Sequence, residues 1–294
     1  MPAVAYLLGS IPSPDSGILE LGPLRLHAYG LMLAIGILVA TVVADRRWVN
    51  RGGEPKEVVD LALWVVLGGV IGARVYHLFT GYSWDDGGIA GTIEIWEGGL
   101  SIWGAVLGGG LVAWVVCRVR HLDFLALADS IAPGLVLAQA IGRWGNYFNQ
   151  ELFGRPTDLP WGLEIDLAHR PLEYLDAETF HPTFLYESLY ALVIAGVLVW
   201  AERTFRFKRG QTFALYVVLY TAGRFVIENM RSDPATDLGP MRFNAWVSLG
   251  LCLFGIAWFV WLGRRRGGAY EEAPWVERSA AIAESETTSS GDTA

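Results

Sequence analysis

The sequence has 294 residues, of which 53% are hydrophobic and only 18% charged, and its mean hydropathy is +0.36. This composition excludes an ordinary water-soluble domain and predicts a membrane protein. The net charge of -8 and the scattered basic residues argue against nucleic acid as a partner, because phosphate-binding surfaces need clustered positive charge. Cys117 and Cys252 lie within apolar stretches without CxxC spacing, so neither a disulfide framework nor a structural metal site is expected.

Apolar runs of about the length that crosses a bilayer, ~20 residues, recur along the chain. The seven runs are Ala28 to Ala44, Val58 to Phe79, Leu100 to Cys117, Phe124 to Ile141, Phe184 to Trp200, Phe213 to Ile227 and Ala245 to Leu262. The fourth run contains Asp129 and Gln139 and the sixth contains Arg224, polar groups that are costly inside a membrane and therefore need a reason. We expect an all-α, polytopic integral membrane protein with seven transmembrane helices.

Lys and Arg are distributed unequally between alternate loops. Thirteen of them follow the first, third, fifth and seventh runs, whereas the N-terminal segment and the other loops together hold six. The positive-inside rule then predicts an N-terminus outside and a C-terminus in the cytoplasm, with Asp85 and Asp166 on the outer side. Met1 to Gly22 carries no Lys or Arg, so no removable signal peptide is expected.

Composition also predicts how the chain is divided. Glycines between Leu67 and Gly72 and between Gly104 and Gly110 allow helices to approach closely, which we take as packing rather than catalysis. The last residues are rich in Glu, Ser, Thr, Ala and Gly and cannot bury enough apolar surface to order themselves. We therefore expect a transmembrane domain over residues 1–266 and a disordered cytoplasmic tail over residues 267–294.

The densest group of polar residues directly follows the fourth run, from Gly142 to Gly154. Arg143, Asn146, Asn149 and Glu151 lie within nine residues and could present a guanidinium fork and amides to a lipid phosphate. The alternative, that the loop satisfies its own backbone while Arg143 extends to the membrane surface, stays open on spacing alone.

A second group lies on the sixth run and its outward end. Tyr220, Arg224, Glu228 and Arg231 follow one another at intervals of four, four and three, which places them on one helical face. Such a face must point into the bundle or a water-filled cavity, and its charges leave one net positive charge. The alternative is an ion-pair network that only holds helices together.

Two further segments carry polar residues at the outward ends of runs. His181-Pro182 opens the fifth run, and Glu187 lies about a turn inside it. A histidine beside proline is more often a hydrogen-bonding residue than a base. Tyr29, at the start of the first run, could bind a headgroup or only anchor the helix.

Together these segments resemble the prolipoprotein diacylglyceryl transferase family. Residues 142–154 are similar to the family pattern Gly-Arg-x-Gly-Asn-Phe-x-Asn-x-Glu-x-x-Gly, with Tyr147 in place of Phe. The segment from His181 to Glu187 resembles its His-Pro-x-x-Leu-Tyr-Glu segment, and the stretch from Tyr220 to Arg231 its Tyr-x-x-x-Arg-x-x-x-Glu-x-x-Arg stretch. Tyr29-Gly30 and Glu97 to Ser101 also match, so the resemblance covers about Tyr29 to Pro234.

The resemblance implies an enzyme of the bacterial plasma (inner) membrane that transfers the diacylglyceryl group of phosphatidylglycerol to the lipobox cysteine of a prolipoprotein signal peptide. A thioether forms and glycerol phosphate leaves, with no cofactor or metal required. Residue chemistry and resemblance together assign catalysis to Arg143, Glu151, His181, Glu187 and Arg224. Substrate binding is assigned to Tyr29, Arg143, Asn146, Asn149, Tyr186, Tyr220, Arg224, Glu228 and Arg231.

The sequence departs from the family at Trp103, where many members have a histidine with an essential role. An indole donates a hydrogen bond but cannot accept a proton. Either the base is elsewhere in this chain or that histidine is not the base in the family in general. The thiol still needs activation, by a base or by a positive local field that lowers its pKa, and Glu151, His181, Glu187 and Tyr29 are the candidates.

Two other classes of function compete with this one. A transporter or channel would line its path with Arg224, Glu228 and Glu187, but it would also predict internal repeats and broken helices, which the sequence lacks. A noncatalytic membrane scaffold would tolerate single changes of its polar residues.

Overall fold

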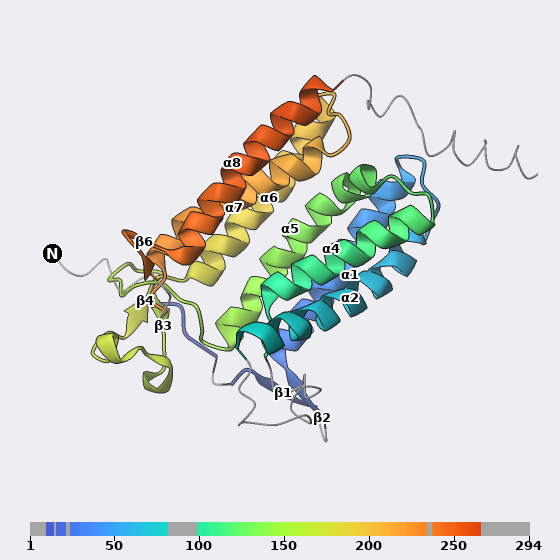
Figure 1. Ribbon diagram of the computed structural model, residues 1–294. Coiled ribbons are helices and arrows are strands. Elements are labelled where there is room, and N and C mark those ends of the chain that lie inside the picture. The colour runs from blue at the N-terminus through green and yellow to red at the C-terminus, as the bar shows by residue number, and fades with distance from the viewer. Residues whose placement is uncertain (1–9, 15, 22–23, 82–98, 234–236, 266–294) are drawn as a thin grey trace, which may run out of the picture. The chain divides into compact units, whose positions relative to one another are not determined.

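The computed structural model describes residues 10–14, 16–21, 24–81, 99–233 and 237–265 (Figure 1). These residues form two compact units. The first unit is made by the chain up to Val43 and the chain from Ile131 onward, and the second by the chain between Ala44 and Ser130. Asp85, Glu97, Gly98 and the expected tail from residue 267 lie outside the described residues.

Each of the seven apolar runs forms a helix, as predicted. The helices are α1 (Ala28–Val49), α2 (Glu57–Thr80), α4 (Ile102–Val119), α5 (Phe124–Phe148), α6 (Thr183–Thr204), α7 (Gln211–Met230) and α8 (Phe243–Arg264). Six of these described helices are long and apolar enough to cross a membrane, and α7 is the exception. Arg224 and Glu228 lower its hydropathy. Many large apolar side chains on the helices are exposed, as expected where a protein faces lipid rather than water.

Short antiparallel hairpins join the helices, which the all-α prediction did not include. They pair β1 (Ile18–Leu21) with β2 (Leu24–His27), β3 (Leu163–Glu164) with β4 (Thr179–Phe180), and β5 (Asp237–Leu238) with β6 (Met241–Arg242). In the first hairpin Ile18 lies opposite His27. Two 3-10 helices, η3 (Leu167–His169) and η4 (Leu172–Tyr174), lie between β3 and β4.

Small residues bring α1 and α5 together in the first unit. A Cβ atom added at Gly134 would lie 2.7 Å from the backbone oxygen of Ala40, and one at Gly36 would lie 3.1 Å from that of Ala138. Close backbone approach at small residues is the usual way in which membrane helices pack, because lipid supplies no hydrophobic drive between them.

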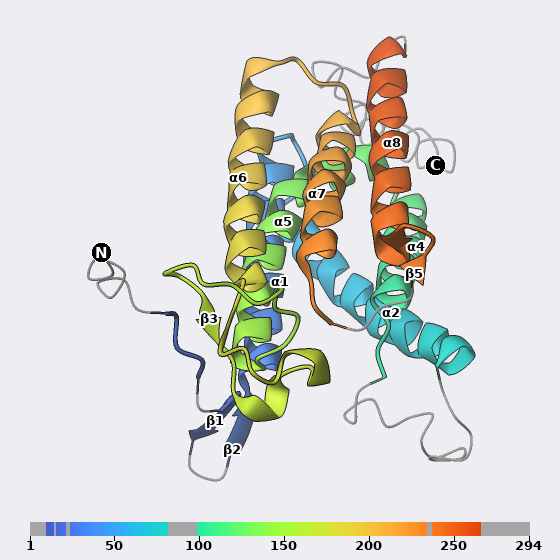
Figure 2. The same cartoon turned by 90° about the vertical axis from the view of Figure 1, so that its left-hand side faces the viewer.

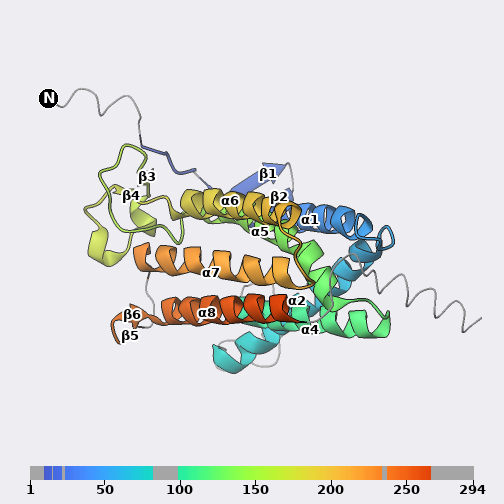
Figure 3. The ribbon, with the colours of Figure 1, turned by 90° about the horizontal axis from the view of Figure 1, so that it is seen from above.

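Helix α7 lies between α6 and α8, and the three views agree on this order (Figures 1, 2 and 3). Its inner face is fixed by α6, where the Tyr190 hydroxyl donates a hydrogen bond to the backbone oxygen of Leu219 at 2.7 Å. Leu198 and Tyr216 are buried in the same apolar cluster. A helix with two charged residues is thus held between two more apolar helices.

In the second unit, α2 packs along α4 through the two glycine-rich patches (Figure 1). A Cβ atom at Gly72 would lie 2.9 Å from the Cα atom of Gly108, so no side chain fits there. The prediction that these glycines serve packing is confirmed.

Candidate active site

The charged residues expected in the site lie near the same end of three helices of the first unit. Arg143 lies five residues before the end of α5, Glu187 four residues after the start of α6, and Arg224 six residues before the end of α7. At a rise of 1.5 Å per residue, these positions are about 6–9 Å inside the helix ends. Charged groups at that depth reach the membrane surface without crossing the bilayer centre, where they cost most.

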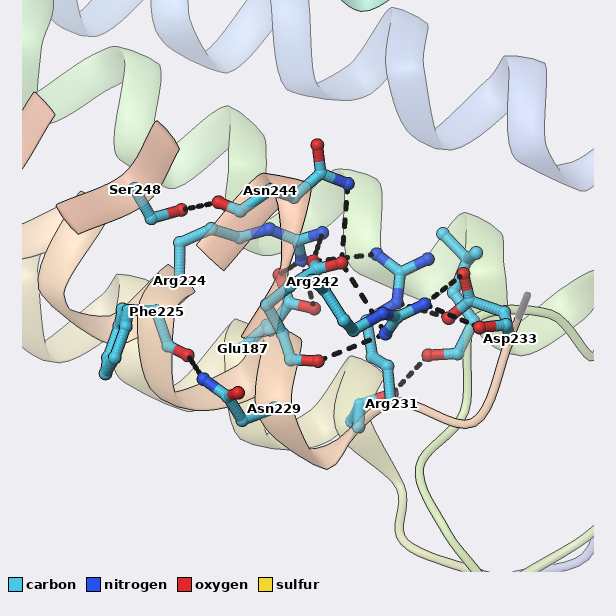
Figure 4. A network of polar contacts seen from close by, with 12 residues as sticks. Glu187, Arg224, Phe225, Asn229, Arg231, Asp233, Arg242, Asn244 and Ser248 are labelled. Carbon is cyan, nitrogen blue, oxygen red and sulfur yellow. Dashed lines mark hydrogen bonds and ion pairs between the residues drawn. The ribbon is translucent and has the colours of Figure 1, made fainter. Parts of the chain in front are cut away.

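Glu187 joins two arginines from different helices. Its Oε2 atom lies 2.9 Å from Nη2 of Arg143. Its Oε1 atom lies 3.2 Å from Nη1 of Arg224 (Figure 4). The Arg143 guanidinium also donates to the Tyr220 hydroxyl at 3.4 Å. The three helices α5, α6 and α7 are therefore linked by one set of charges, which brings together four of the expected site residues.

The network continues along α7, as the spacing predicts. Nη2 of Arg224 lies 2.6 Å from Oε2 of Glu228, and Nη1 of Arg231 lies 3.6 Å from the same oxygen. The Glu228 side chain is only 1% exposed. A carboxylate buried this deeply requires several donors, because an unpaired buried charge is costly.

Three members of the network were missed from the sequence: Asp233, Arg242 and Asn244. Arg242 donates to the backbone oxygen of Glu228 at 3.1 Å, and its Nη1 lies 3.5 Å from Oε1 of the same residue (Figure 4). Asn244 Nδ2 donates to that Oε1 at 3.3 Å, while Asp233 pairs with Arg231 at 2.6 Å and with Arg242 at 3.2 Å. The sequence did place Arg242 and Asn244 just before the last apolar run. Polar residues are common at such a position, because it lies at the membrane surface, so they did not stand out as site residues.

A small cavity lies inside this arrangement. It measures about 10 Å³, room for about one water, and its wall includes Arg143, Glu187, Tyr220 and Arg224. Gln139, Tyr190, Ala191, Gly223 and Ile227 complete the wall. Gln139 is one of the polar residues of the fourth run that are costly inside a membrane. Its amide donates a hydrogen bond to the Tyr216 hydroxyl at 2.9 Å.

The residues after Ile141 differ from the expected loop. Helix α5 continues to Phe148, so Arg143 and Asn146 lie on its last turns rather than in irregular chain. The helix can pass through Gly142 and Gly145 because its side chains find partners: Arg143 Nη1 donates to Asn146 Oδ1 at 3.5 Å. The expected boundary at Ile141 was wrong, since glycine weakens a helix by only about 1 kcal/mol and packing outweighs this cost.

Glu151 is held just beyond the end of α5. Its Oε1 atom accepts hydrogen bonds from Asn146 at 2.8 Å and from Asn149 at 3.2 Å. The neighbours on either side have left-handed backbone, with φ of 50° at Gln150 and 57° at Leu152. Non-glycine residues rarely adopt left-handed backbone, so this turn is energetically costly. Costly turns of this kind cluster at functional sites, where they fix the orientation of a side chain.

Two signature glycines make room for expected site residues. A Cβ atom at Gly145 would lie 2.6 Å from Cδ2 of Tyr29, and one at Gly154 would lie 2.7 Å from Cβ of His181. The backbone N–H of Gly154 donates to the backbone oxygen of His181 at 2.9 Å. Tyr29 is thus packed on the same turn of α5 that carries Arg143 and Asn146.

His181 and Tyr186 form a separate polar group. Nδ1 of His181 lies 3.2 Å from the Tyr186 hydroxyl, which also accepts a hydrogen bond from Trp161 Nε1 at 2.9 Å. Neither residue is part of the cavity wall. His181 thus hydrogen-bonds with Tyr186 outside the cavity, and its assignment to catalysis stays a prediction.

Trp103 lies in the first turn of α4, in the second unit, and is 40% exposed. An indole there offers a donor and an amphipathic ring, but no site for a proton.

The charges of the first unit's network define what it can hold. Across Arg143, Arg224 and Arg231 on one side and Glu187 and Glu228 on the other, one positive charge is left over; including Arg242 and Asp233 does not change this balance. Two guanidinium forks face the cavity, and such forks match the oxygens of a phosphate. The site is thus suited to a singly charged anion at the membrane surface.

Comparison with known proteins agrees with this chemistry. The sequence model of the prolipoprotein diacylglyceryl transferase family matches residues 16–261. The chain is 48% identical to a phosphatidylglycerol–prolipoprotein diacylglyceryl transferase 2 of Streptomyces coelicolor, over 89% of this chain and 83% of that protein. It is 46% identical to the phosphatidylglycerol–prolipoprotein diacylglyceryl transferase of Cutibacterium acnes, over 90% of both chains. The match covers every helix that carries a site residue, and the chain belongs to the prolipoprotein diacylglyceryl transferase family.

Proposed function

We propose that this enzyme transfers the diacylglyceryl group of phosphatidylglycerol to the lipobox cysteine thiol of prolipoproteins, forming a thioether and releasing glycerol phosphate. The observation that carries the proposal is the single excess positive charge of the network, presented by Arg143 and Arg224 around one cavity. A phosphodiester carries one negative charge, so its binding would neutralise the network.

The cavity holds only about one water, and the lipid phosphate must therefore compete with a group that is already there. Glu187 is that group, because its two oxygens occupy the forks of Arg143 and Arg224. We expect the phosphate to take over one edge of each guanidinium while Glu187 keeps the other. Two forks then stabilise the charge that grows on the phosphate as it leaves.

In the transfer step, the cysteine sulfur forms a bond to the glycerol carbon of the lipid, and the bond between that carbon and the phosphate oxygen breaks. The electron pair stays on the phosphate oxygen, and the thiol proton passes to a base. Glu151 suits this role, because both of its hydrogen bonds use Oε1 and no described residue donates a hydrogen bond to Oε2. Both oxygens of Glu187 are held by arginines, which makes it the less suitable candidate.

The partners and the placement in the membrane belong to the same proposal. The substrates are phosphatidylglycerol and a prolipoprotein signal peptide with a lipobox cysteine, presented in the lipid bilayer of the bacterial plasma membrane. Seven crossings, with α7 held between α6 and α8, would place the N-terminus outside and the C-terminus in the cytoplasm. The proposed catalytic domain covers residues 1–266, with residues 267–294 as a cytoplasmic tail.

The test is a transfer assay with the purified chain. The protein is mixed with vesicles of phosphatidylglycerol labelled in its acyl chains and with a peptide that carries a lipobox cysteine. Label should move to the peptide in a bond that resists hydroxylamine and reductant, as a thioether does, and a peptide with serine for cysteine should stay unlabelled. A protein that moves solutes across sealed vesicles but transfers no label would be a transporter instead.

A further inference from the structure

A second, wider pocket of about 320 Å³ lies next to Glu151, outside the cavity already described. Its wall is built by the β1–β2 hairpin and the chain before it, by the end of α5, and by η3. The polar residues that matter here are Ser16, His27, Asn149, Glu151 and His169. Its volume is at the low end of the range for ligand sites, about 300–1,000 Å³.

The lining of this pocket disfavours a phosphate. Among the described residues its lining has no Lys or Arg, and it includes the carboxylate of Glu151. His27 and His169 are exposed, and neither side chain makes a hydrogen bond or an ion pair with a described residue. Amide, hydroxyl and imidazole groups beside one carboxylate suit a polar chain, such as a peptide backbone, better than a lipid headgroup with its negative charge.

The pocket is connected to the phosphate cavity through a short chain of side chains. Glu151 accepts from Asn146 at 2.8 Å, and Asn146 in turn accepts from Arg143 at 3.5 Å. A group that touches Glu151 and a phosphate on Arg143 would therefore both be held by the same short segment, the last turns of α5 and the residues that follow it.

The pocket also lies at the level where the apolar helices α1 and α5 end. His27 directly precedes α1, and Phe148 is the last residue of α5. A substrate that is half embedded in the membrane and half in water would cross this level, with its first polar residues beside the pocket.

We infer that this pocket receives the acceptor cysteine of the prolipoprotein together with the residue that follows it, with the thiol directed at Glu151. The inference rests on the proposed function, since it assigns the place of one of the two substrates. The volume of about 320 Å³ is ample for a cysteine and the residue that follows it.

Disulfide trapping tests the location without depending on catalysis. In the full chain with Cys117→Ala and Cys252→Ala, one cysteine is introduced at Ser16, and a matched control carries Glu173→Cys, an exposed position of η4 outside both pockets. Each protein in phosphatidylcholine vesicles, which lack the proposed lipid donor and so leave the peptide thiol unconsumed, is mildly oxidised with the lipobox peptide. We expect at least tenfold more peptide disulfide at position 16 than at 173, and suppression by excess peptide with serine for cysteine. Equal yields would overturn the inference.

The transfer assay of the proposed function is run beside the trapping experiment. If the wild type labels no peptide, the proposed function fails, whereas the disulfide yields still decide where the peptide binds.

Discussion

Arg224 and Glu187 face each other from neighbouring helices, with Nη1 of Arg224 at 3.2 Å and 3.3 Å from the two carboxylate oxygens of Glu187. Glu187 also lies 2.9 Å from Arg143, so one carboxylate aligns the two guanidinium forks that we propose bind the phosphate. Without its negative charge, the two guanidinium groups would repel each other across the cavity.

Glu187→Gln should lower kcat for diacylglyceryl transfer at least tenfold, equivalent to about 1.4 kcal/mol. The amide keeps the size of the side chain but turns an NH2 group toward one arginine, so the forks lose their alignment. The measurement is the transfer rate at saturating lipid and peptide. Glu178→Gln, at an exposed loop position, is the control and should keep full activity. Equal rates for the two variants would mean that Glu187 does not align the arginines.

Arg143→Lys should lose most activity, about 10- to 100-fold, although the positive charge is kept. Lysine lacks the planar fork that reaches Glu187, Tyr220 and Asn146 together. Arg155→Lys is the matched control, because Arg155 lies in the same signature region with an exposed side chain. Near-normal turnover of Arg143→Lys would remove the argument for a bidentate contact.

Gly145→Ala should reduce transfer strongly, whereas Gly142→Ala should not. The added methyl at position 145 would lie 2.6 Å from the Tyr29 ring and must displace it, while at position 142 the nearest atom is 3.8 Å away, on Leu33. Both changes favour the helix by up to ~1 kcal/mol in propensity, so helix stability cannot explain a difference between them. Thermal unfolding and transfer rates of the two variants, measured side by side, check this; similar activities would show that the position of Tyr29 is unimportant.

Trp103→Phe should retain substantial activity, and Glu151→Gln should lose far more. Phenylalanine keeps most of the ring, whereas glutamine removes the proton acceptor and the charge that orients Asn146 and Asn149. Both variants are assayed for thiol transfer across a range of pH. Loss of activity in the first variant with full retention in the second would put the chemistry on the indole instead.

The orientation in the membrane can be tested with single cysteines in a chain that lacks Cys117 and Cys252. A cysteine at Arg206 should react with an impermeant thiol reagent only after cells are opened, and a cysteine at Asp166 should react in intact cells. Labelling at position 206 but not at 166 in intact cells would reverse the assignment.

Much of the site could be read from the spacing of charged residues. The intervals between Tyr220, Arg224, Glu228 and Arg231 place them on one helical face whatever the helix packs against, and the contacts among the last three follow from that face. The helices could also be predicted from the sequence, because a continuous apolar run of bilayer length can cross a membrane in few other structures.

Other features needed long-range contacts. Helix α5 extends to Phe148 although the glycines of its last turns lower the helix propensity. Contacts with Tyr29 and Glu187, which come from distant parts of the chain, stabilise this extension. The short hairpins carry no strand pattern in so few residues, and turns such as those at Gln150 and Leu152 have no local signature.

The sequence by itself determined the membrane class, the helices and the charged face of α7 that carries candidate phosphate-binding residues, because these depend on local hydropathy and on periodicity. Only the tertiary structure decided that Glu187 lies between Arg143 and Arg224, that Arg242 and Asn244 complete the shell of Glu228, and that His181 pairs with Tyr186 away from the cavity. The physical reason is that a buried charge takes its partners from whichever elements the packing brings near, and packing between helices far apart in sequence leaves no periodic trace in the chain.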